Sequence, residues 1–375
     1  MPESIDIHKF LELRTLLPVL DARSEGEFGH AHIPGALNLP LLNNDEREKV
    51  GTCYKQKGRK EAVLLGFDLV GGKFGDYIRK AASLRLSPKE RELQTHEPFD
   101  GKREGKVSPV GGELEGVVIY CWRGGMRSNI MAWLLENAGM KVHVLQGGYK
   151  TYRHWALNEF AEHLNLLVLG GKTGSGKTEV LHEMKKAGEQ VIDLEALAHH
   201  RGSAFGALGR PAQPTTEQFE NYLALELLQI DRKKILWLEN ESSKIGGVKI
   251  PDGIYNKIRA TTVVEIEVPL EKRIENIARD YASFPKEKLA EATKRIEKKL
   301  GNKNMNDGLN YLNENDFYNW IKILLDYYDK AYTFSKSQRA TGTVLSIPIT
   351  GENHSEIAAA VISFAKQKIE TKSSC

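Results

Sequence analysis

The sequence predicts an α/β protein of two domains, each built on a largely parallel sheet. The chain has 375 residues, which is enough for two domains with separate hydrophobic cores. Twice, an apolar run enters a glycine-rich loop that opens an amphipathic helix, at residues 116–136 and again at 164–185. Further apolar runs alternate with helical patterns along the chain, an order that is typical of parallel sheets.

The first domain is expected over residues 1–158. Its first apolar run, 17–20, predicts a short strand, and the Ile-Pro-Gly-Ala segment at 33–36 is a turn that leads into a second strand. A long, polar, lysine-rich insertion with some helical pattern follows at about 43–110. The run 142–145 predicts the last strand of the domain.

A cysteine ends the strand expected at 116–120, and a glycine-rich loop leads from it into a helix at 129–136. In this arrangement the loop N–H groups and the positive end of the helix converge on the sulfur of Cys121. With Arg123 and Arg127 close by, that field favours the thiolate, the nucleophilic form of cysteine. The alternative is a small buried residue without chemistry, as for most lone cysteines. The predicted anion-binding loop consists of Arg123, Gly124, Gly125, Arg127 and Ser128.

The second domain is expected over residues 159–375 and carries a complete Walker A sequence. The buried strand predicted at 164–169 runs into Gly-Lys-Thr-Gly-Ser-Gly-Lys-Thr, and a helix follows at 179–185. Backbone N–H groups of such a loop cradle phosphates, Lys177 reaches the terminal phosphate, and Thr178 can hold Mg²⁺. The motif predicts a phosphate-bearing ligand, and it does not show that ATP is hydrolysed. The predicted diphosphate-binding residues are Gly171, Gly174, Ser175, Gly176, Lys177 and Thr178.

A further acidic group is expected near the phosphate loop. The apolar run that starts at Lys234 ends in Glu239 and Glu241, where a P-loop fold often places an acid associated with magnesium. The alternative is a carboxylate that is merely solvated at a strand end.

The C-terminal part combines two more strands with a long helical region. Residues 262–268, with alternating polarity, and 344–348 predict strands, whereas 269–340 are helical with mixed charge. Lysines concentrate at 286–303 and aromatic residues at 311–332, a combination that can hold RNA phosphates and stacked bases. The alternatives are a solvated helix face for the lysines and a packed core for the rings.

Composition narrows the class of protein. With 41% hydrophobic and 27% charged residues the chain resembles ordinary soluble globular proteins. Neither a signal-peptide pattern nor an apolar run near the ~20 residues of a membrane helix is visible, so we expect a cytoplasmic protein without a membrane partner. The cysteines at 53, 121 and 375 form no disulfide framework, which leaves a thiol available for catalysis. The net charge of +3 neither identifies nor excludes a polyanionic partner.

Short stretches distributed over most of residues 12–155 form a recognisable set: Asp21-x-Arg23, Glu27-Phe28, His32 to Ala36, Asn38 to Pro40, the Cys121 loop and Gly147 to Tyr149. In these stretches and in their order the first domain resembles the rhodanese family. The resemblance implies that Cys121 carries a chalcogen. Five residues separate Cys121 from Arg127, whereas sulfur-transferring rhodaneses usually have four, and the longer spacing resembles that of rhodanese-like phosphatases. The loop is therefore wide enough for a phosphate or for a bulkier chalcogen donor.

Longer and less common strings occur in both domains, at 41–47, 50–56, 121–128, 193–195 and 198–206. With these strings the chain resembles the tRNA 2-selenouridine synthase family over essentially its whole length. The implied fold is α/β, with an N-terminal rhodanese-like domain and a C-terminal P-loop NTPase-like domain that ends in a helical, basic part.

This resemblance implies a transferase that acts on tRNA. Enzymes of the family replace the sulfur of 2-thiouridine at the wobble position (U34) with selenium from selenophosphate, and they attach a geranyl group to that sulfur from geranyl diphosphate. Cys121 would then become an S-selanylcysteine intermediate, and the Walker A loop would grip the diphosphate, with Mg²⁺ at Thr178. The expected partners are the anticodon arm of tRNA and an enzyme that supplies selenophosphate, and no tightly bound cofactor is expected. Cys53 and Glu239 are assigned auxiliary roles.

Other interpretations stay open at this point. ATP or GTP is the main rival for the Walker A loop. Cys53 either resolves an intermediate on Cys121 or packs within the insertion. One alternative is a rhodanese-like phosphatase, in which the phosphate loop would have no role. Another is a thiosulfate sulfurtransferase with a regulatory nucleotide domain, whose activity would not depend on tRNA. A non-catalytic RNA-binding module would leave both loops unexplained.

Overall fold

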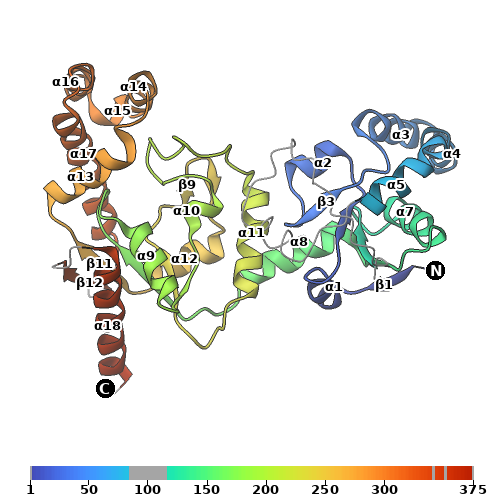
Figure 1. The fold of residues 1–375 in the computed structure, drawn as a ribbon, viewed down its shortest axis with the longest axis horizontal. Helices are drawn as coiled ribbons and strands as arrows, with labels where there is room; N and C mark the ends of the chain where they lie inside the picture. Colours follow the sequence, from blue (N-terminus) through green and yellow to red (C-terminus); the bar gives the residue numbers. More distant parts are fainter. Residues whose placement is uncertain (1, 84–115, 340–342, 350–352, 374–375) are drawn as a thin grey trace. The chain divides into compact units, whose positions relative to one another are not determined.

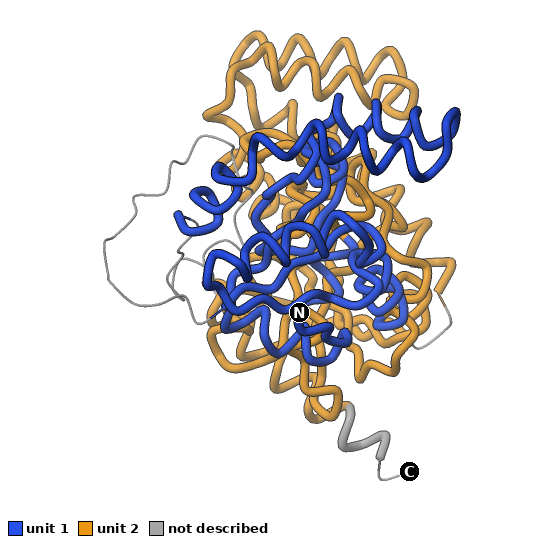
Figure 2. Tube along the Cα trace, turned by 90° about the vertical axis from the view of Figure 1, so that its right-hand side faces the viewer, with its two compact units in different colours: residues 1–159, 220–225 blue, residues 160–219, 226–375 orange. Residues whose placement is uncertain are grey.

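The structure, a computed structural model, describes four stretches of the chain (Figure 1): residues 2–83, 116–339, 343–349 and 353–373. The chain forms two compact units (Figure 2): unit 1 is Met1–Glu159 with Glu220–Leu225, and unit 2 is Phe160–Phe219 with Glu226–Cys375. Each unit contains its own parallel sheet, as the sequence predicts.

Unit 1 is built on a five-stranded parallel sheet with the order β1-β5-β4-β2-β3. The strands are β1 (Glu3–Ile5), β2 (Val19–Asp21), β3 (Ala36–Asn38), β4 (Val117–Tyr120) and β5 (Val142–Leu145). All four residues of the central strand β4 are buried, because helices cover parallel sheets on both faces. The predicted strands are all present. β1 was not predicted, since its sequence Glu-Ser-Ile contains a single apolar residue and so no apolar run.

Besides a segment of α11, the described part of unit 1 contains seven α-helices: α1 (Ile7–Leu13), α2 (Glu25–His30), α3 (Asn44–Lys57), α4 (Arg59–Val70), α5 (Phe74–Ser83), α7 (Met126–Asn137) and α8 (Gly148–Glu159). The insertion expected at 43–110 is thus helical as far as Ser83, and residues 84–115 lie outside the described part. α7 begins three residues before the predicted start at Asn129, because the N–H of Asn129 already bonds to the carbonyl of Gly125 at 3.1 Å.

A buried ion pair holds the end of β2 to its surroundings. Arg23 is 1% exposed and Asp21 is fully buried, and Arg23 Nη2 lies 2.7 Å from Asp21 Oδ2. The same nitrogen donates to the carbonyl of Ala31 at 2.7 Å, and the guanidinium lies 4.0 Å from the ring centre of Tyr149. The Asp-x-Arg pair therefore joins β2, the end of α2 and the start of α8.

Replacing Asp21 by alanine is expected to destabilise unit 1 by about 3–5 kcal/mol, because the Arg23 charge would stay buried without its partner. Urea unfolding of the full chain measures the effect. Glu12→Ala is the control: it removes the exposed Lys9–Glu12 pair (2.9 Å) and should cost less than ~1 kcal/mol. Equal unfolding midpoints for Asp21→Ala and Glu12→Ala would contradict the structural role.

Unit 2 is built on a second five-stranded parallel sheet, with the order β12-β11-β6-β8-β7. Its strands are β6 (Leu166–Gly170), β7 (Gln190–Val191), β8 (Leu236–Glu239), β11 (Val263–Glu267) and β12 (Val344–Pro348). The first four residues of β11 are buried despite their alternating polarity, because β11 lies between β6 and β12. Glu265 is accommodated there by an ion pair with Lys336 at 2.9 Å. A two-stranded antiparallel ribbon adds β9 (Lys244–Ile245) and β10 (Val248–Lys249).

The helices of unit 2 form two groups. Those associated with the sheet include α9 and α18, which share one apolar core with its central strands. A second core is centred on the fully buried Trp320 and is made mainly by the helices from α13 to α17, which confirms a packed core for part of the aromatic run. The helices are α9 (Lys177–Lys186), α10 (Leu194–Leu197), α11 (Thr216–Leu228), α12 (Asp252–Ala260), α13 (Leu270–Tyr281), α14 (Lys286–Lys294), α15 (Glu297–Leu300), α16 (Asn302–Asn313), α17 (Phe317–Ser337) and α18 (His354–Ser373).

The middle of α11, residues Glu220–Leu225, is counted with unit 1. Asn221 is fully buried there, and its amide donates to the carbonyl of His32 at 2.9 Å and to the hydroxyl of Tyr149 at 2.8 Å. The sequence pattern does not indicate that this segment of α11 packs with unit 1.

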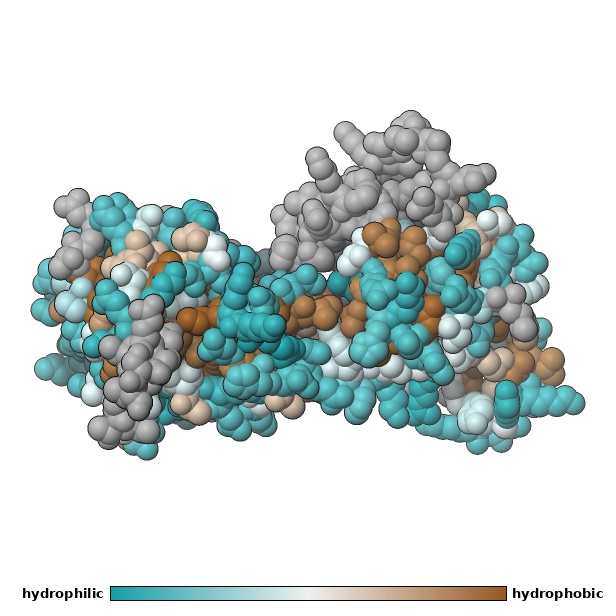
Figure 3. All heavy atoms as spheres, turned by 90° about the horizontal axis from the view of Figure 1, so that it is seen from below, coloured by the Kyte–Doolittle hydropathy of each residue, from teal (hydrophilic) through white to brown (hydrophobic). Residues whose placement is uncertain are grey.

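Hydrophilic side chains predominate on the face of the molecule drawn in Figure 3, and hydrophobic ones gather in separate groups. Among the helices that the structure describes, none is long and apolar enough to cross a membrane.

Candidate active sites

The first site is the loop that follows β4 in unit 1. Cys121 is 3% exposed, its sulfur accepts the N–H of Gly125 at 3.3 Å, and the hydroxyl of Ser128 lies 3.2 Å away. Since α7 begins at Met126, the sulfur lies beside the N-terminal turn of that helix, where the backbone dipoles favour negative charge. The predicted convergence of loop and helix on the sulfur is therefore present in the geometry.

Two glycines let the loop pass close to the start of α8. Gly124 has φ of +62°, and a Cβ there would lie 2.8 Å from the nitrogen of Gly147. Gly148 has φ of +61°, and a Cβ there would lie 2.2 Å from the carbonyl oxygen of Cys121. Backbone approach this close requires glycine at both positions. The Gly-Gly-Tyr sequence is thus part of the thiol loop's support.

The two arginines of the loop have different surroundings. Arg127 Nη1 lies 2.5 Å from Glu27 Oε2, and Arg47 Nε lies 3.4 Å from the same oxygen. Burial alone would raise the pKa of Glu27, but its hydrogen bond and charge pairing with Arg127 hold it below the usual value. Arg123 is exposed and has no ion pair with another described residue. Arg123 is therefore the guanidinium available to an incoming anion, and Arg127 fixes the loop to α2.

Cys53, the other free thiol among the described residues, is half-buried on α3. Neither Cys53 nor Cys121 forms a disulfide with a described residue, and the position of Cys53 within the helical insertion is compatible with packing. Cys375 lies outside the described residues.

The second site is the phosphate loop between β6 and α9 in unit 2. Lys177 Nζ donates to the carbonyl of Gly171 at 3.0 Å, so the lysine side chain lies along its own loop. Gly174 has φ of +81°, and a Cβ there would lie 2.8 Å from the carbonyl oxygen of Arg273. The strand, loop and helix follow the predicted order.

Side chains from α13 and α17 brace the phosphate loop. Arg273 Nε donates to the carbonyl of Thr173 at 2.9 Å, and Asn276 donates to that of Gly174 at 2.9 Å. The N–H of Gly171 donates to the hydroxyl of Tyr332 at 3.0 Å. These braces lie about a hundred or more residues after the loop, and no motif in the sequence marks them.

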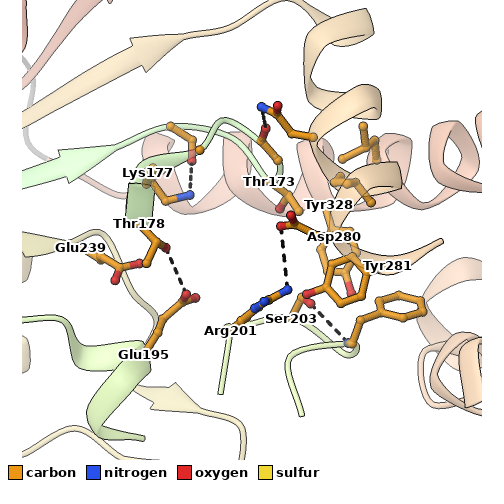
Figure 4. Close-up of a pocket in the computed structure, with 18 of the residues that line it drawn as sticks. Thr173, Lys177, Thr178, Glu195, Arg201, Ser203, Glu239, Asp280, Tyr281 and Tyr328 are labelled. Carbon is orange, nitrogen blue, oxygen red and sulfur yellow. Dashed lines mark hydrogen bonds and ion pairs between the residues drawn. The ribbon is translucent and has the colours of Figure 1, made fainter. Parts of the chain in front are cut away.

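Three glutamates meet beside Thr178. Carboxylate oxygens of Glu195, Glu239 and Glu241 lie within 4.8 Å of one another, and the hydroxyl of Thr178 donates to Glu195 at 3.3 Å (Figure 4). Glu239 is 1% exposed, and neither of its carboxylate oxygens accepts a hydrogen bond from a described residue. Of this set, the sequence analysis singled out Glu239 and Glu241 as candidate acids. Glu195 joins them because β7 and β8 end at the same edge of the sheet.

Crowding and burial keep protons on these carboxyls. Burial, followed by the Glu241 charge, raises the pKa of Glu195 to about 8. Burial also raises the pKa of Glu241 to about 7 and that of Glu239 well above its usual value. An unsatisfied, oxygen-only donor set of this kind fits a hard divalent cation such as Mg²⁺. Such a cation would lie next to the phosphates held by the loop and neutralise part of their charge.

Mg²⁺ affinity is expected to rise at least ~10-fold between pH 6 and pH 8.5, because the cation competes with the protons that Glu195 and Glu241 hold up to about pH 8 and 7. Without a cation the folded state binds more protons than the unfolded state in this range. Stability therefore falls as pH rises, by up to ~1.4 kcal/mol per pH unit for each titrating carboxyl. Thermal unfolding with EDTA or Mg²⁺ at both pH values measures this.

Glu239→Gln should weaken the stabilisation by Mg²⁺ and flatten the pH dependence measured in EDTA. Asp252→Asn is a matched control, because Asp252 is an exposed acid of unit 2 that pairs with Lys249 at 2.9 Å. A wild-type unfolding temperature at pH 8.5 that does not respond to Mg²⁺ would speak against a cation site.

A cavity of about 340 Å³ adjoins the phosphate loop. One side is polar and includes Lys177, Thr178 and the three glutamates. Another carries Arg201, which lies 3.8 Å from Asp280 and stacks on the ring of Tyr281 at 5.6 Å (Figure 4). The apolar side consists largely of residues from α17 and its neighbours: Phe205, Ile277, Trp320, Ile321, Leu324 and Leu325. The cavity therefore suits a ligand that has an anionic end and a hydrocarbon end.

Known proteins are similar in sequence to both units of this chain. A family model described as the tRNA 2-selenouridine synthase AAA domain matches residues 164–361, which include the phosphate loop, the acidic cluster and α17. A tRNA 2-selenouridine synthase of Sulfurovum sp. (strain NBC37-1) is 34% identical over 375 residues, covering 91% of this chain and 94% of that relative. This chain belongs to the tRNA 2-selenouridine synthase family. The resemblance found in the sequence strings is thereby confirmed.

Other members of the tRNA 2-selenouridine synthase family align over shorter stretches. The relative from Nitrosomonas europaea is 37% identical over 270 residues, 70% of this chain and 63% of its own length. The one from Bdellovibrio bacteriovorus is 40% identical over 273 residues, 71% of this chain and 64% of its own length. A crystal structure of the N-terminal domain of a putative ATP/GTP binding protein from Clostridium difficile 630 is 37% identical, covers 41% of this chain and 99% of its own, and has a TM-score of 0.32.

Proposed function

We propose that the protein converts 2-thiouridine at the wobble position of tRNA into 2-selenouridine with selenophosphate, by way of S-geranyl-2-thiouridine formed from geranyl diphosphate. Family membership supports the overall reaction. The observation that carries the two-step route is the cavity of unit 2, where a phosphate loop and an apolar wall line the same space.

Unit 2 carries out the geranylation. The diphosphate lies on the loop N–H groups with Lys177 and Arg201 as cationic partners, and the hydrocarbon chain lies against the α17 wall. The thiocarbonyl sulfur of the uridine attacks C1 of the geranyl group, the C1–O bond breaks, and diphosphate leaves with the electron pair. Donors that face the departing diphosphate stabilise the charge that develops on it. A cation at the glutamate cluster would add to that stabilisation.

Unit 1, as a rhodanese-like domain, carries out the selenation. Arg123 and the amides of Gly124 and Gly125 receive selenophosphate. The Cys121 thiolate attacks its selenium, the Se–P bond breaks and phosphite leaves with the electron pair, which gives an S-selanylcysteine. Alkylation has by then turned the uridine sulfur into a thiolate leaving group and has made C2 electrophilic. The terminal selenide attacks C2, geranylthiolate leaves with the C2–S electron pair, and an added small thiol cleaves the S–Se bond to release 2-selenouridine. Dividing one difficult displacement into two easier ones is the usual benefit of covalent activation.

The test is mass spectrometry of nucleosides from a 2-thiouridine tRNA incubated with the wild-type protein. Geranyl diphosphate alone should give S-geranyl-2-thiouridine, and the later addition of selenophosphate should give 2-selenouridine. Excess ATP should not inhibit the first step if the cavity prefers a prenyl chain. Absence of both products, with release of phosphate from a phosphoester or persulfide formation from thiosulfate, would support a phosphatase or a sulfurtransferase instead.

A further inference from the structure

The helices α3 and α4 form a hairpin whose turn carries a cluster of cations (Figure 1). α3 ends at Lys57, α4 begins at Arg59, and the single residue between them, Gly58, has φ of +85°. Every residue from Tyr54 to Glu61 is exposed. Four cations in this stretch, which we call the hairpin tip, have no hydrogen bond or ion pair with any residue that the structure describes: Lys55, Lys57, Arg59 and Lys60.

Neutralised cations are found elsewhere on the surface of unit 1. Lys9 lies 2.9 Å from Glu12, and Arg79 pairs with Asp76. At the hairpin tip four cations fall within six residues, and no acid pairs with them. Adjacent like charges repel one another, and a polyanion that binds them relieves the repulsion.

The hairpin contributes only a few side chains to the core of unit 1: Val70 belongs to it, and Val50 and Leu69 pack against it. Of the 14 residues of α3 only Glu46 is buried. On both helices large side chains remain in solvent, with Tyr54 58%, Leu64 51% and Phe67 46% exposed. A helix that buries so little surface contributes little to folding, so its exposed side is available for binding.

The other end of α3 is fixed to the Cys121 loop. Asn43 caps the helix by accepting the N–H of Glu46 at 2.9 Å. Glu27 Oε2 binds both Arg127 of the thiol loop and Arg47 in the first turns of α3, and Glu27 Oε1 accepts a second hydrogen bond from Arg127 at 3.2 Å. From Arg47 to Lys57 the helix rises by about 15 Å at ~1.5 Å per residue. α3 thus holds the hairpin tip at a set distance from the reacting thiol.

We infer that the hairpin tip binds backbone phosphates of the tRNA whose wobble base reacts at Cys121, and so positions the anticodon arm. The inference rests on the proposed function. Duplex nucleic acid carries one phosphate charge per ~1.7 Å of its axis, so a stem that runs along α3 presents several phosphates to the hairpin tip. Contacts of this kind position an RNA without reading its sequence. The exposed Tyr54 ring within the tip offers a surface for stacking.

The test is a variant in which Lys55, Lys57, Arg59 and Lys60 are all alanine. At 100 mM salt its Kd for a 2-thiouridine tRNA, measured by filter binding, should be at least ~30-fold weaker than wild type. The slope of log K against log salt should fall by about 3, since each lost phosphate contact removes ~0.7–0.9. The KM for tRNA should rise by a similar factor, with kcat at saturating tRNA unchanged.

The control variant removes the same charge from the lysine-rich helices of unit 2, by alanine at Lys294, Lys298, Lys299 and Lys303, all of which are exposed. It should bind tRNA nearly as well as wild type. Unchanged circular dichroism and unfolding temperature will show that the hairpin variant is folded. Wild-type affinity and salt slope in the hairpin variant, or an equal loss in the control, would overturn the inference. Failure of the proposed function would be seen separately, as wild-type protein that yields no 2-selenouridine.

Discussion

Replacing Cys121 by alanine is expected to reduce formation of 2-selenouridine by at least ~10³-fold while S-geranyl-2-thiouridine accumulates. Removal of a covalent nucleophile eliminates its step outright, whereas the phosphate loop of the other unit stays intact. Nucleoside mass spectrometry of the tRNA after sequential addition of geranyl diphosphate and selenophosphate measures both products from one sample.

Two further variants test the hydroxyl next to the Cys121 sulfur and the second described thiol. Ser128→Ala removes the hydroxyl 3.2 Å from the sulfur and should slow selenation by ~10-fold, because one hydrogen bond to the thiolate is lost. Cys53→Ser should retain selenation if the half-buried thiol on α3 only packs. Selenation by Cys121→Ala at the wild-type rate would exclude Cys121 as the selenium carrier, and loss of selenation in Cys53→Ser would assign Cys53 a chemical role.

Replacing Lys177 by alanine is expected to slow geranylation by about 10²–10³-fold, because the charge of the departing diphosphate would lose its principal cationic donor. Selenation of tRNA that has been geranylated beforehand should proceed normally. Initial rates with geranyl diphosphate measure the first step, and pre-geranylated tRNA with selenophosphate measures the second.

Lys172→Ala provides the matched control from the same loop. Lys172 is half-exposed and lies 3.3 Å from Asp329, so its loss should change the rate only a few-fold. Normal geranylation by Lys177→Ala would remove the phosphate loop from the reaction. Slow selenation of pre-geranylated tRNA would mean that the loop acts in both steps.

The Cys121 loop and the phosphate loop could be predicted from the sequence because each is a local arrangement. In both, an apolar strand, a glycine-rich turn and a helix are consecutive, so the candidate ligand-binding residues lie within about eight positions of one another. Cys121, Lys177 and Thr178 follow from such order alone, because backbone N–H groups and a helix terminus next to a strand end create the site. The strands at 17–20, 116–120, 142–145 and 164–169 were predictable from their apolar runs for a similar reason.

What only the tertiary structure decided are the partners that arrive from distant parts of the chain. Glu27 pairs with Arg127, which follows it by 100 residues in the chain, and Arg123 remains the accessible charge. The spacing of the two arginines in the sequence does not show which of them is paired. Glu195 joins Glu239 and Glu241 because parallel strands end at one edge of the sheet, and α17 closes the cavity from residues that match no motif. Side-chain pairing, burial and cavity shape depend on which elements pack together, and local sequence does not encode that choice.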